Sequence, residues 1–203
     1  FERVLFTGGE PLILAEIYAM VAYAAERLPV TLLTNAVLAR GARLEKLAAV
    51  NHPNLAVQVS LDGARAEHHD PYRGAGSWQR TLEGLRLLRE RGLRVKLATT
   101  ETPANCAHLE ELCAFHLALG IPEEDHFTRA MARRGFAEKG VDVDVNTLAP
   151  EITVDDCGMY WHPLGPEEDM RLSREILPLA EAVRLVQEKL AAMGPAAAPK
   201  DFK

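Results

Sequence analysis

The stretch that decides the fold is Arg3–Leu12, RVLFTGGEPL, in which an apolar run ends in two adjacent glycines, an acid and a proline. The short apolar run predicts a β-strand that finishes at this point. Gly8 and Gly9 permit unusual backbone angles and close approach of a ligand, and Pro11 suits the first turn of a following helix. A carboxylate and free carbonyls beside such a gap would suit an ammonium group.

Runs of the same kind recur along the chain and alternate with amphipathic segments. Strands are predicted at 4–7, 30–34, 55–61, 93–100 and 125–130, and helices at 12–28, 41–50, 77–91 and 106–119. A strand and helix repeating every 25–40 residues or so, roughly the length of a βα unit, predicts a parallel sheet. Nearly continuous apolar strands indicate a sheet that is covered on both faces or closed into a barrel.

Two of the predicted helices carry clear end signals. The helix at 77–91 has one apolar stripe and ends before Gly92. For the helix at 106–119, Asn105 is the expected N-cap, and Gly120 follows the last apolar position. The apolar stripe of the first consists of Trp78, Leu82, Leu85 and Leu88.

Polar residues gather where the predicted strands finish. They are Thr7-Gly8-Gly9-Glu10, Thr34-Asn35, Ser60 with Asp62, and Thr99-Thr100-Glu101. In parallel α/β folds the carboxyl ends of the strands share one rim, where ligands bind. One polar strand end is ordinary turn chemistry, whereas four in succession predict the lining of a polar site.

The motifs LFTGGEP, LLTNA and VSLDGARAEHHDPYRG, in this order, resemble the core of radical S-adenosylmethionine enzymes. The resemblance covers roughly Val4 to Gly135. It implies an α/β fold, a partial (βα)6 barrel of the TIM type, in which this chain would begin at the second strand.

The same resemblance implies a set of residues that bind S-adenosylmethionine. The glycine pair and Glu10 would hold the methionine amino group, and Arg73 would lie close to the carboxylate. Asn35, Ser60 and Asp62 are similar in position to residues that face the ribose and methionine moieties. The full set is Thr7, Gly8, Gly9, Glu10, Asn35, Ser60, Asp62 and Arg73.

The cysteines depart from the family pattern, because the CxxxCxxC motif that binds the [4Fe-4S] cluster is absent from the chain. Three thiolates would hold three irons and leave the fourth for the cofactor, and no other cysteine arrangement in the chain can substitute. Cys106 and Cys113 are predicted to be ordinary core residues. The metal ligands are therefore expected upstream of Phe1, a first residue that itself suggests missing sequence; the alternative is a degenerate relative without a cluster.

The resemblance implies an enzyme that reductively cleaves S-adenosylmethionine at the cluster. The resulting 5′-deoxyadenosyl radical would take a hydrogen atom from a substrate, for which a peptide or protein is the candidate, and an external donor would supply the electron. Orientation and exclusion of side reactions would be the protein's contribution. The alternative from another class is a cluster-free barrel that serves as a binding or scaffold subunit.

Two further polar groups have competing interpretations. Adjacent residues in a loop seldom converge on one ion, so His68-His69-Asp70 is expected to shape the loop that presents Arg73 rather than bind a metal. Arg129, Arg133 and Arg134 would either meet a substrate carboxylate at the rim or form a solvated surface cluster.

The character of the chain changes beyond Gly135, which predicts a core at 1–135 and a C-terminal extension at 136–203. A β-hairpin is expected at about 141–163 and a helix at about 176–192, followed by a loose tail. The hairpin resembles the start of the extension in peptide-modifying radical enzymes. Only Cys157 is available there, so an auxiliary cluster is not expected, and Tyr160, Trp161 and His162 are expected to pack.

Composition sets the remaining bounds. The chain has 203 residues, 48% apolar and 26% charged, with a formal net charge of −6. This is the balance of a soluble globular domain with or without an appendage, and it argues against a nonspecific nucleic-acid binder. No apolar run approaches the ~18 residues of a membrane span and no leader pattern is present. We therefore expect a cytoplasmic protein with reduced cysteines.

Overall fold

The computed structural model describes residues 2–133, 140–142, 151–162 and 170–192. The chain divides into two compact units, residues 1–131 and 132–202. We call them the first unit and the second unit and describe each by itself. The boundary expected at residue 135 falls outside the described ranges and stays a prediction.

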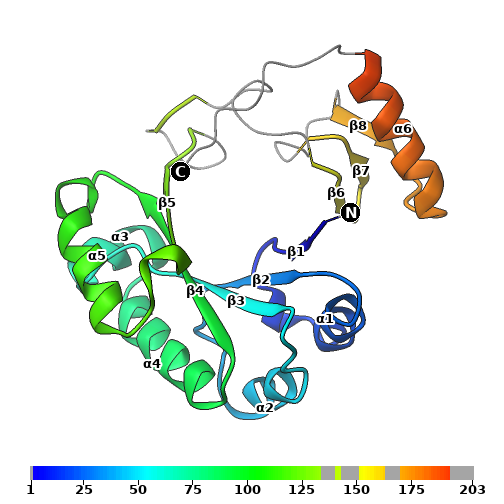
Figure 1. Ribbon diagram of the computed structural model, residues 1–203. Coiled ribbons are helices and arrows are strands. Elements are labelled where there is room, and N and C mark those ends of the chain that lie inside the picture. The colour runs from blue at the N-terminus through cyan, green and yellow to red at the C-terminus, as the bar shows by residue number, and fades with distance from the viewer. Residues whose placement is uncertain (1, 134–139, 143–150, 163–169, 193–203) are drawn as a thin grey trace. The chain divides into compact units, whose positions relative to one another are not determined.

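A parallel sheet forms the centre of the first unit. Its strands are β1 Val4–Phe6, β2 Val30–Thr34, β3 Leu55–Ser60, β4 Arg94–Glu101 and β5 His126–Ala130. They pair in chain order and in parallel, with Val57 opposite both Leu32 and Val95. The sheet curves as a half-barrel with helices around its outside (Figure 1). The predicted α/β barrel class is confirmed.

Helices and short 3₁₀ turns (η) connect the strands. They are η1 Pro11–Ile13, α1 Ile17–Ala25, α2 Gly41–Ala49, α3 Ala66–Arg73, α4 Ser77–Glu90, η2 Cys106–His108, α5 Leu109–Ala118 and η3 Glu123–Asp125. The helices predicted at 41–50 and 77–91 are confirmed. In the part of the chain that the structure describes, no helix is long and apolar enough to cross a membrane.

The helix predicted at 12–28 is wrong at its start. Glu10 accepts a hydrogen bond from the N–H of Leu12 at 3.1 Å, which holds the first turn as η1. Leu14 then leaves the turn with an extended backbone, and α1 begins only at Ile17. The apolar pattern continues through this break, so periodicity alone could not reveal it.

Two expectations about the following segments are also wrong. The loop predicted around residues 68–70 is part of helix α3, which contains Pro71 and ends at Gly74 with a positive φ of 94°. The predicted cap Asn105 makes no capping hydrogen bond and is only 1% exposed. Its carboxamide instead bonds to the ends of two strands, as described below. The helix predicted at 106–119 accordingly starts as η2.

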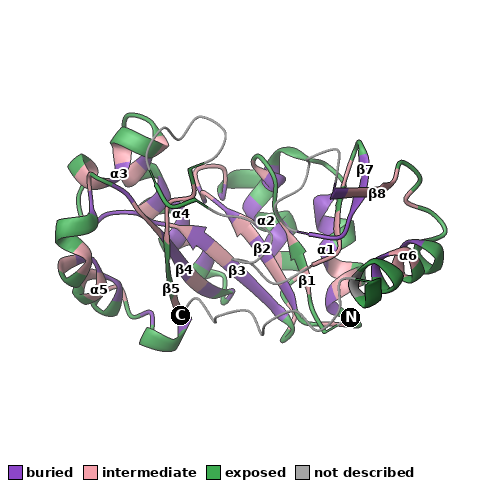
Figure 2. Cartoon of the chain, turned by 90° about the horizontal axis from the view of Figure 1, so that it is seen from above, coloured by how far each residue is buried: buried purple, intermediate pink, exposed green. Residues whose placement is uncertain are grey.

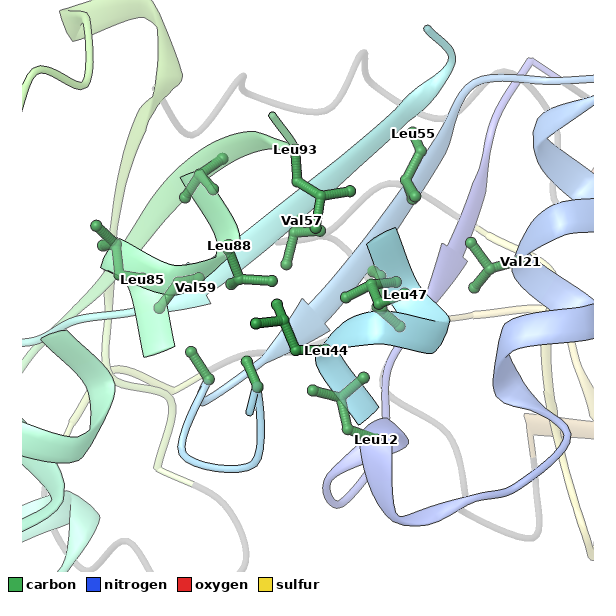
Figure 3. Packing of buried hydrophobic residues seen from close by; sticks show 14 of the residues in the cluster. Leu12, Val21, Leu44, Leu47, Leu55, Val57, Val59, Leu85, Leu88 and Leu93 are labelled. Atoms are coloured by element: carbon green, nitrogen blue, oxygen red, sulfur yellow. The ribbon is translucent and has the colours of Figure 1, made fainter. Parts of the chain in front are cut away.

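Alternate residues of the strands face the helices. In β3 this row contains Val57 and Val59, which are fully buried in one cluster with Leu88 of α4 (Figure 3). The intervening Gln58 and Ser60 are half-buried. Successive side chains of a strand point to opposite faces. One face of β3 therefore carries the apolar core, and Gln58 and Ser60 lie on the other face. In Figure 2 the central strands are coloured largely as buried.

Helix α4 lies very close to the loop that follows β2. A Cβ built on Gly84 would overlap the carbonyl oxygen of Ala36, a residue that is itself fully buried with a φ of 59°. The hydroxyl of Thr81 donates to the carbonyl of Asn35 at 2.9 Å. A buried close contact and a hydrogen bond thus hold the end of β2 against α4.

The two cysteines expected in the core are not buried. Cys106 is exposed and Cys113 is half-buried, and both are free, as is the exposed Cys157. Cys106 lies in η2 before α5 begins, so it does not share the apolar face that a continuous helix would have provided.

In its described residues, the second unit contains a small antiparallel sheet and a helix. Its elements are β6 Thr153–Asp155, β7 Gly158–Tyr160, β8 Arg171–Ser173 and α6 Leu179–Ala192. The turn between β6 and β7 forms because Asp155 accepts from the N–H groups of Cys157 and Gly158, at 2.8 and 3.1 Å. The expected packing of Tyr160, Trp161 and His162 is confirmed by their exposures of 1%, 4% and 0%.

The second unit also differs from expectation. β8 is a third strand that the sequence did not predict, and α6 begins later than the expected residue 176. Residues 143–150, which belong to the hairpin expected at about 141–163, lie outside the described residues, as does the tail beyond residue 192.

Candidate functional site

Glu10 joins the ends of the first two strands. Its Oε1 accepts from the hydroxyl of Thr34 at 2.7 Å, in addition to Leu12, and its Oε2 accepts from the N–H of Asn35 at 2.9 Å. Thr34 is the last residue of β2 and is buried. Hydrogen bonds to an ionised carboxylate are short and strong. Glu10 therefore fixes the glycine turn after β1 against the end of β2.

The glycine turn itself borders open space. Gly8 has a φ of 122°, which favours glycine, and a Cβ built on Gly8 or on Gly9 would meet no atom within 4 Å. Thr7, Gly8 and Gly9 are all exposed. The packing of the chain thus gives no reason for glycine at position 9, whereas close approach of a ligand does.

Asn35 lies beside this turn, and the oxygen of its carboxamide already accepts a hydrogen bond. Its Oδ1 accepts from the N–H of Val37 at 2.9 Å, so the side chain can offer its NH₂ group as a donor. The residue is half-buried. Its backbone is held on both sides, by Glu10 at the N–H and by Thr81 at the carbonyl.

A second polar cluster forms at the ends of β3 and β4. The carboxylate of Asp62 accepts from Nε of Arg73 at 2.6 Å and from the N–H of Thr100 at 2.8 Å. Asp62 is 1% exposed, whereas the Arg73 side chain is 28% exposed. The carboxylate is thereby enclosed, and the outer Nη groups of Arg73 are the donors that this pair can present to an anion.

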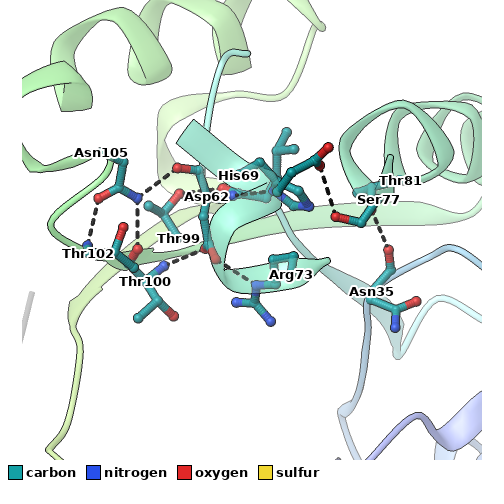
Figure 4. A network of polar contacts seen from close by, with 12 residues as sticks. Asn35, Asp62, His69, Arg73, Ser77, Thr81, Thr99, Thr100, Thr102 and Asn105 are labelled. Carbon is teal, nitrogen blue, oxygen red and sulfur yellow. Dashed lines mark hydrogen bonds and ion pairs between the residues drawn. The ribbon is translucent and has the colours of Figure 1, made fainter. Parts of the chain in front are cut away.

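Asn105 ties the same two strand ends together (Figure 4). Its Nδ2 donates to the carbonyls of Asp62 and Thr100, at 2.7 and 2.8 Å, and its Oδ1 accepts from the N–H of Thr102 at 2.6 Å. Its carboxamide thus satisfies three backbone groups in a buried place, where an unpaired group would be unfavourable. The sequence suggested a helix cap instead, because an asparagine just before a helix can either cap the helix or, as here, bond to neighbouring strand ends.

The side chains of His68, His69 and Asp70 make three different contacts: the ring of His68 stacks on His108, His69 bonds to Asp62, and Asp70 bonds to the start of α4. His69 is 1% exposed and its Nδ1 accepts from the N–H of Asp62 at 3.1 Å. Burial lowers the pKa of His69, and Arg73 lowers it further while Asp62 and Asp70 oppose the shift. The neutral ring is the form that can accept from Asp62.

Asp70 holds the start of α4. Its Oδ1 accepts from the N–H of Trp78 at 2.9 Å and from the hydroxyl of Ser77 at 3.1 Å, and its Oδ2 accepts from the N–H of Gly76 at 2.6 Å. Partial burial alone would raise the pKa of Asp70, but these hydrogen bonds outweigh it and lower the pKa.

Of the arginines expected at the rim, Arg129 belongs to the first unit and Arg133 to the second. Arg129 is exposed on β5, while Arg133 donates through Nε to Asp142 at 2.9 Å. Arg134 lies outside the described residues. Whether these arginines meet a substrate carboxylate or form a solvated surface cluster stays a prediction.

The donor set fits the methionine end of S-adenosylmethionine. Open space beside two glycines suits an ammonium group, and the free Nη donors of Arg73 suit a carboxylate. The three cysteines of the chain do not supply the spacing for a [4Fe-4S] cluster. Fold and site together define a parallel half-barrel whose strand ends carry an open glycine turn, the Glu10 carboxylate and the Arg73–Asp62 pair.

Comparison with known proteins names the family. The profile of the Radical SAM superfamily matches residues 1–112, and the chain belongs to this superfamily. The resemblance inferred from the sequence is thus confirmed, and the family's cofactors are S-adenosylmethionine and a [4Fe-4S] cluster.

Several known proteins are similar to the chain. AdoMet-dependent heme synthase of Methanosarcina barkeri is 37% identical over 118 residues, which cover 57% of this chain and 32% of that protein. Mycofactocin maturase MftC of Mycobacterium tuberculosis is 37% identical over 106 residues, which cover 51% and 27%. The chain thus spans about a third of the length of these relatives.

The fold is also that of a solved structure. Streptococcus suis SuiB superposes with a TM-score of 0.55 at 16% identity, covering 95% of this chain and 37% of SuiB. SuiB bound to S-adenosylmethionine superposes with a TM-score of 0.51 at 20% identity, covering 64% and 29%.

Proposed function

We propose that this chain is the cofactor-binding half-barrel of an enzyme that begins radical chemistry by reductive cleavage of S-adenosylmethionine. The observation that carries the proposal is the open glycine turn, held in place by Glu10, in a chain of this family. The bound cofactor and cluster would supply a 5′-deoxyadenosyl radical, which takes a hydrogen atom from the substrate. The cluster needs three cysteines outside this chain.

The chain's own residues bind and orient the cofactor. Thr7, Gly8 and Gly9 would bring backbone groups close to the methionine ammonium, which Glu10 also attracts by its charge. The NH₂ of Asn35 and the hydroxyl of Ser60 would meet the ribose and methionine moieties. Arg73 would hold the carboxylate. Because Asp62 is enclosed, we assign it the positioning of Arg73 rather than direct contact with the cofactor.

We further propose a peptide or protein as the substrate. The support is the β6–β7 hairpin of the second unit, which is of the kind expected for the extension of peptide-modifying members. The heme synthase relatives act on a different chemical class, so a tetrapyrrole is the competing substrate. Production of 5′-deoxyadenosine stimulated by a tetrapyrrole and not by a peptide would reject the peptide.

The test of activity uses the full-length protein. After anaerobic reconstitution with iron and sulfide, reduction in the presence of S-adenosylmethionine should yield 5′-deoxyadenosine, measured by liquid chromatography and mass spectrometry. A full-length sequence without a CxxxCxxC motif, or a protein that forms neither a cluster nor 5′-deoxyadenosine, would favour the cluster-free scaffold instead.

The test of the site is Gly9→Ala. The new Cβ meets no atom of the protein within 4 Å, and φ at this position is not in the left-handed region, so folding should be unaffected. Because the methyl group would occupy the space proposed for the ligand, we expect at least tenfold weaker binding of S-adenosylmethionine, or about 1.4 kcal/mol.

A second test variant and a matched control accompany the glycine change. Glu10→Gln should weaken binding as well, because it removes the charge and sets an NH₂ group among donors. Glu16→Gln alters an exposed acid of the next segment that makes no side-chain cap, and should leave binding unchanged. Wild-type affinity in Gly9→Ala, measured by equilibrium dialysis, would place the cofactor elsewhere.

A further inference from the structure

Outside the proposed cofactor site, three potential metal ligands from two segments meet beside α3. His68 belongs to α3, His108 is the last residue of η2, and Glu111 lies in the first turn of α5. One ligand atom from each lies within 4.8 Å of the other two. Their separation in sequence hides this cluster, because the second histidine follows the first only 40 positions later.

The spacing of the second and third ligands follows from local geometry. Residues three apart on one helical turn are neighbours on its surface. Nδ1 of His108 accordingly lies 3.7 Å from Oε2 of Glu111. The ring of His68 lies against that of His108, with 4.1 Å between centroids and 17° between planes.

Glu111 and His68 each have an atom that is available to coordinate a metal ion. Oε1 of Glu111 is held by Arg65, with Nη2 at 2.7 Å and Nε at 2.8 Å, which leaves Oε2 on the histidine side. Nδ1 of His68 is buried and finds no hydrogen-bond partner among the residues that the structure describes. A buried polar atom without a partner is unfavourable, and a metal ion would supply that partner.

We propose that His68, His108 and Glu111 bind a divalent transition-metal ion, with Zn²⁺ as the best match. Two imidazoles and one carboxylate are typical ligands of zinc and of neighbouring first-row metals, whereas Mg²⁺ and Ca²⁺ prefer oxygen ligands alone. Three protein ligands leave a fourth position for water or another ligand. Binding requires the two rings to leave their parallel stack, which the half-exposed side chain of His108 allows.

The metal would join two segments that also serve the proposed cofactor site. Helix α3 ends at Arg73, and η2 directly follows Asn105, which holds the ends of β3 and β4. A bridge between His68 and His108 would therefore stiffen both segments. The metal site itself does not depend on the proposed function, because none of its ligands is a proposed cofactor contact.

The experiment is a titration of the full-length protein with Co²⁺, followed by displacement with Zn²⁺. We expect one Co²⁺ whose visible bands, taken as the difference between the wild type and His108→Ala, show nitrogen and oxygen ligation without a sulfur charge-transfer band, because cysteines of a cluster motif would bind Co²⁺ in both proteins. His108→Ala and Glu111→Gln should each weaken binding at least tenfold. Glu110→Gln changes the exposed neighbouring acid and should leave the affinity unchanged.

His68→Ala should also weaken binding tenfold, and circular dichroism will show whether this half-buried change disturbs the fold. The exposed His108 keeps the test informative if it does. Equal Co²⁺ affinity in the wild type, His108→Ala and Glu111→Gln would overturn the proposal, as would a spectrum of sulfur ligation only. Binding of S-adenosylmethionine, measured in the same variants, separates this failure from failure of the cofactor site.

Discussion

Gly84→Ala tests how the end of β2 is held against α4. The added Cβ would overlap the carbonyl oxygen of Ala36 and lie 3.1 Å from the Ala36 Cβ. Both residues are buried, and Thr81 fixes the preceding carbonyl of Asn35 at 2.9 Å. The loop and the helix must therefore move apart to admit one methyl group.

The magnitude follows from two opposing effects. In a helix, alanine is more favourable than glycine by about 1 kcal/mol. Inserting a methyl group into a packed site costs about 1–3 kcal/mol or more, and losing the Thr81 hydrogen bond adds about 1 kcal/mol. The contact involves backbone, which cannot rotate away as a side chain can. We expect a net loss of about 1–3 kcal/mol, or a Tm lower by about 3–10 °C.

The assay is thermal unfolding followed by circular dichroism, together with binding of S-adenosylmethionine. Binding should weaken too, because Asn35 moves with the loop and its N–H is bonded to Glu10. Adding Ala36→Gly removes the Cβ contact but leaves the carbonyl overlap, so the double variant should remain destabilised. A Gly84→Ala protein with wild-type or higher Tm would refute the close packing of this loop.

Three further substitutions test other parts of the structure. Leu88→Ala should lower the free energy of unfolding by about 2–5 kcal/mol in urea, since Leu88 is fully buried, whereas truncating the half-exposed Leu117 should cost far less; equal losses would contradict the assigned core. Asn105→Ala should cost about 2–4 kcal/mol, because it leaves three buried backbone groups unpaired; a neutral effect would mean that they find other partners. Burial and the nearby His126 lower the pKa of His116 to about 4. Since an unfolded histidine has a pKa of about 6.5, neutral His116 stabilises the fold above that pH, and up to about 3 kcal/mol is lost as the pH falls to about 4. His116→Gln should therefore lose less stability than the wild type over this range, and parallel pH profiles of unfolding would contradict this.

Local signals were enough for most of the first unit. All five strands and the ends of α4 follow from apolar runs and glycines that local rules interpret directly. Local signals did not predict the break after η1 or the hydrogen bonds of Asn105. The first depends on the bond from the N–H of Leu12 to Glu10, and the second on bonds from Asn105 to the carbonyls of Asp62 and Thr100. Helix α3 was missed because its proline and its polar composition are also those of a loop.

The candidate site divides in the same way. Gly8, Gly9 and Glu10 stand out in the sequence, since two glycines at a strand end permit close approach of a ligand and the acid that follows suits an ammonium group. Thr34, which bonds to Glu10, carries no such signal. The proposed metal ligands were invisible as a group, because only packing of α3 beside η2 and α5 brings them together.

The sequence by itself therefore determined the βα order, the polar ends of the strands and the family of this protein. These depend on residue type and on short-range spacing, which the chain carries whether or not it is folded. Only the tertiary structure decided which polar side chains stay open at the strand ends and which hold others in place. Asp62 is the clearest case: its motif suggests a cofactor contact, but burial encloses its carboxylate between Arg73 and Thr100. Burial and pairing depend on neighbours that are remote in sequence, so no local pattern could settle them.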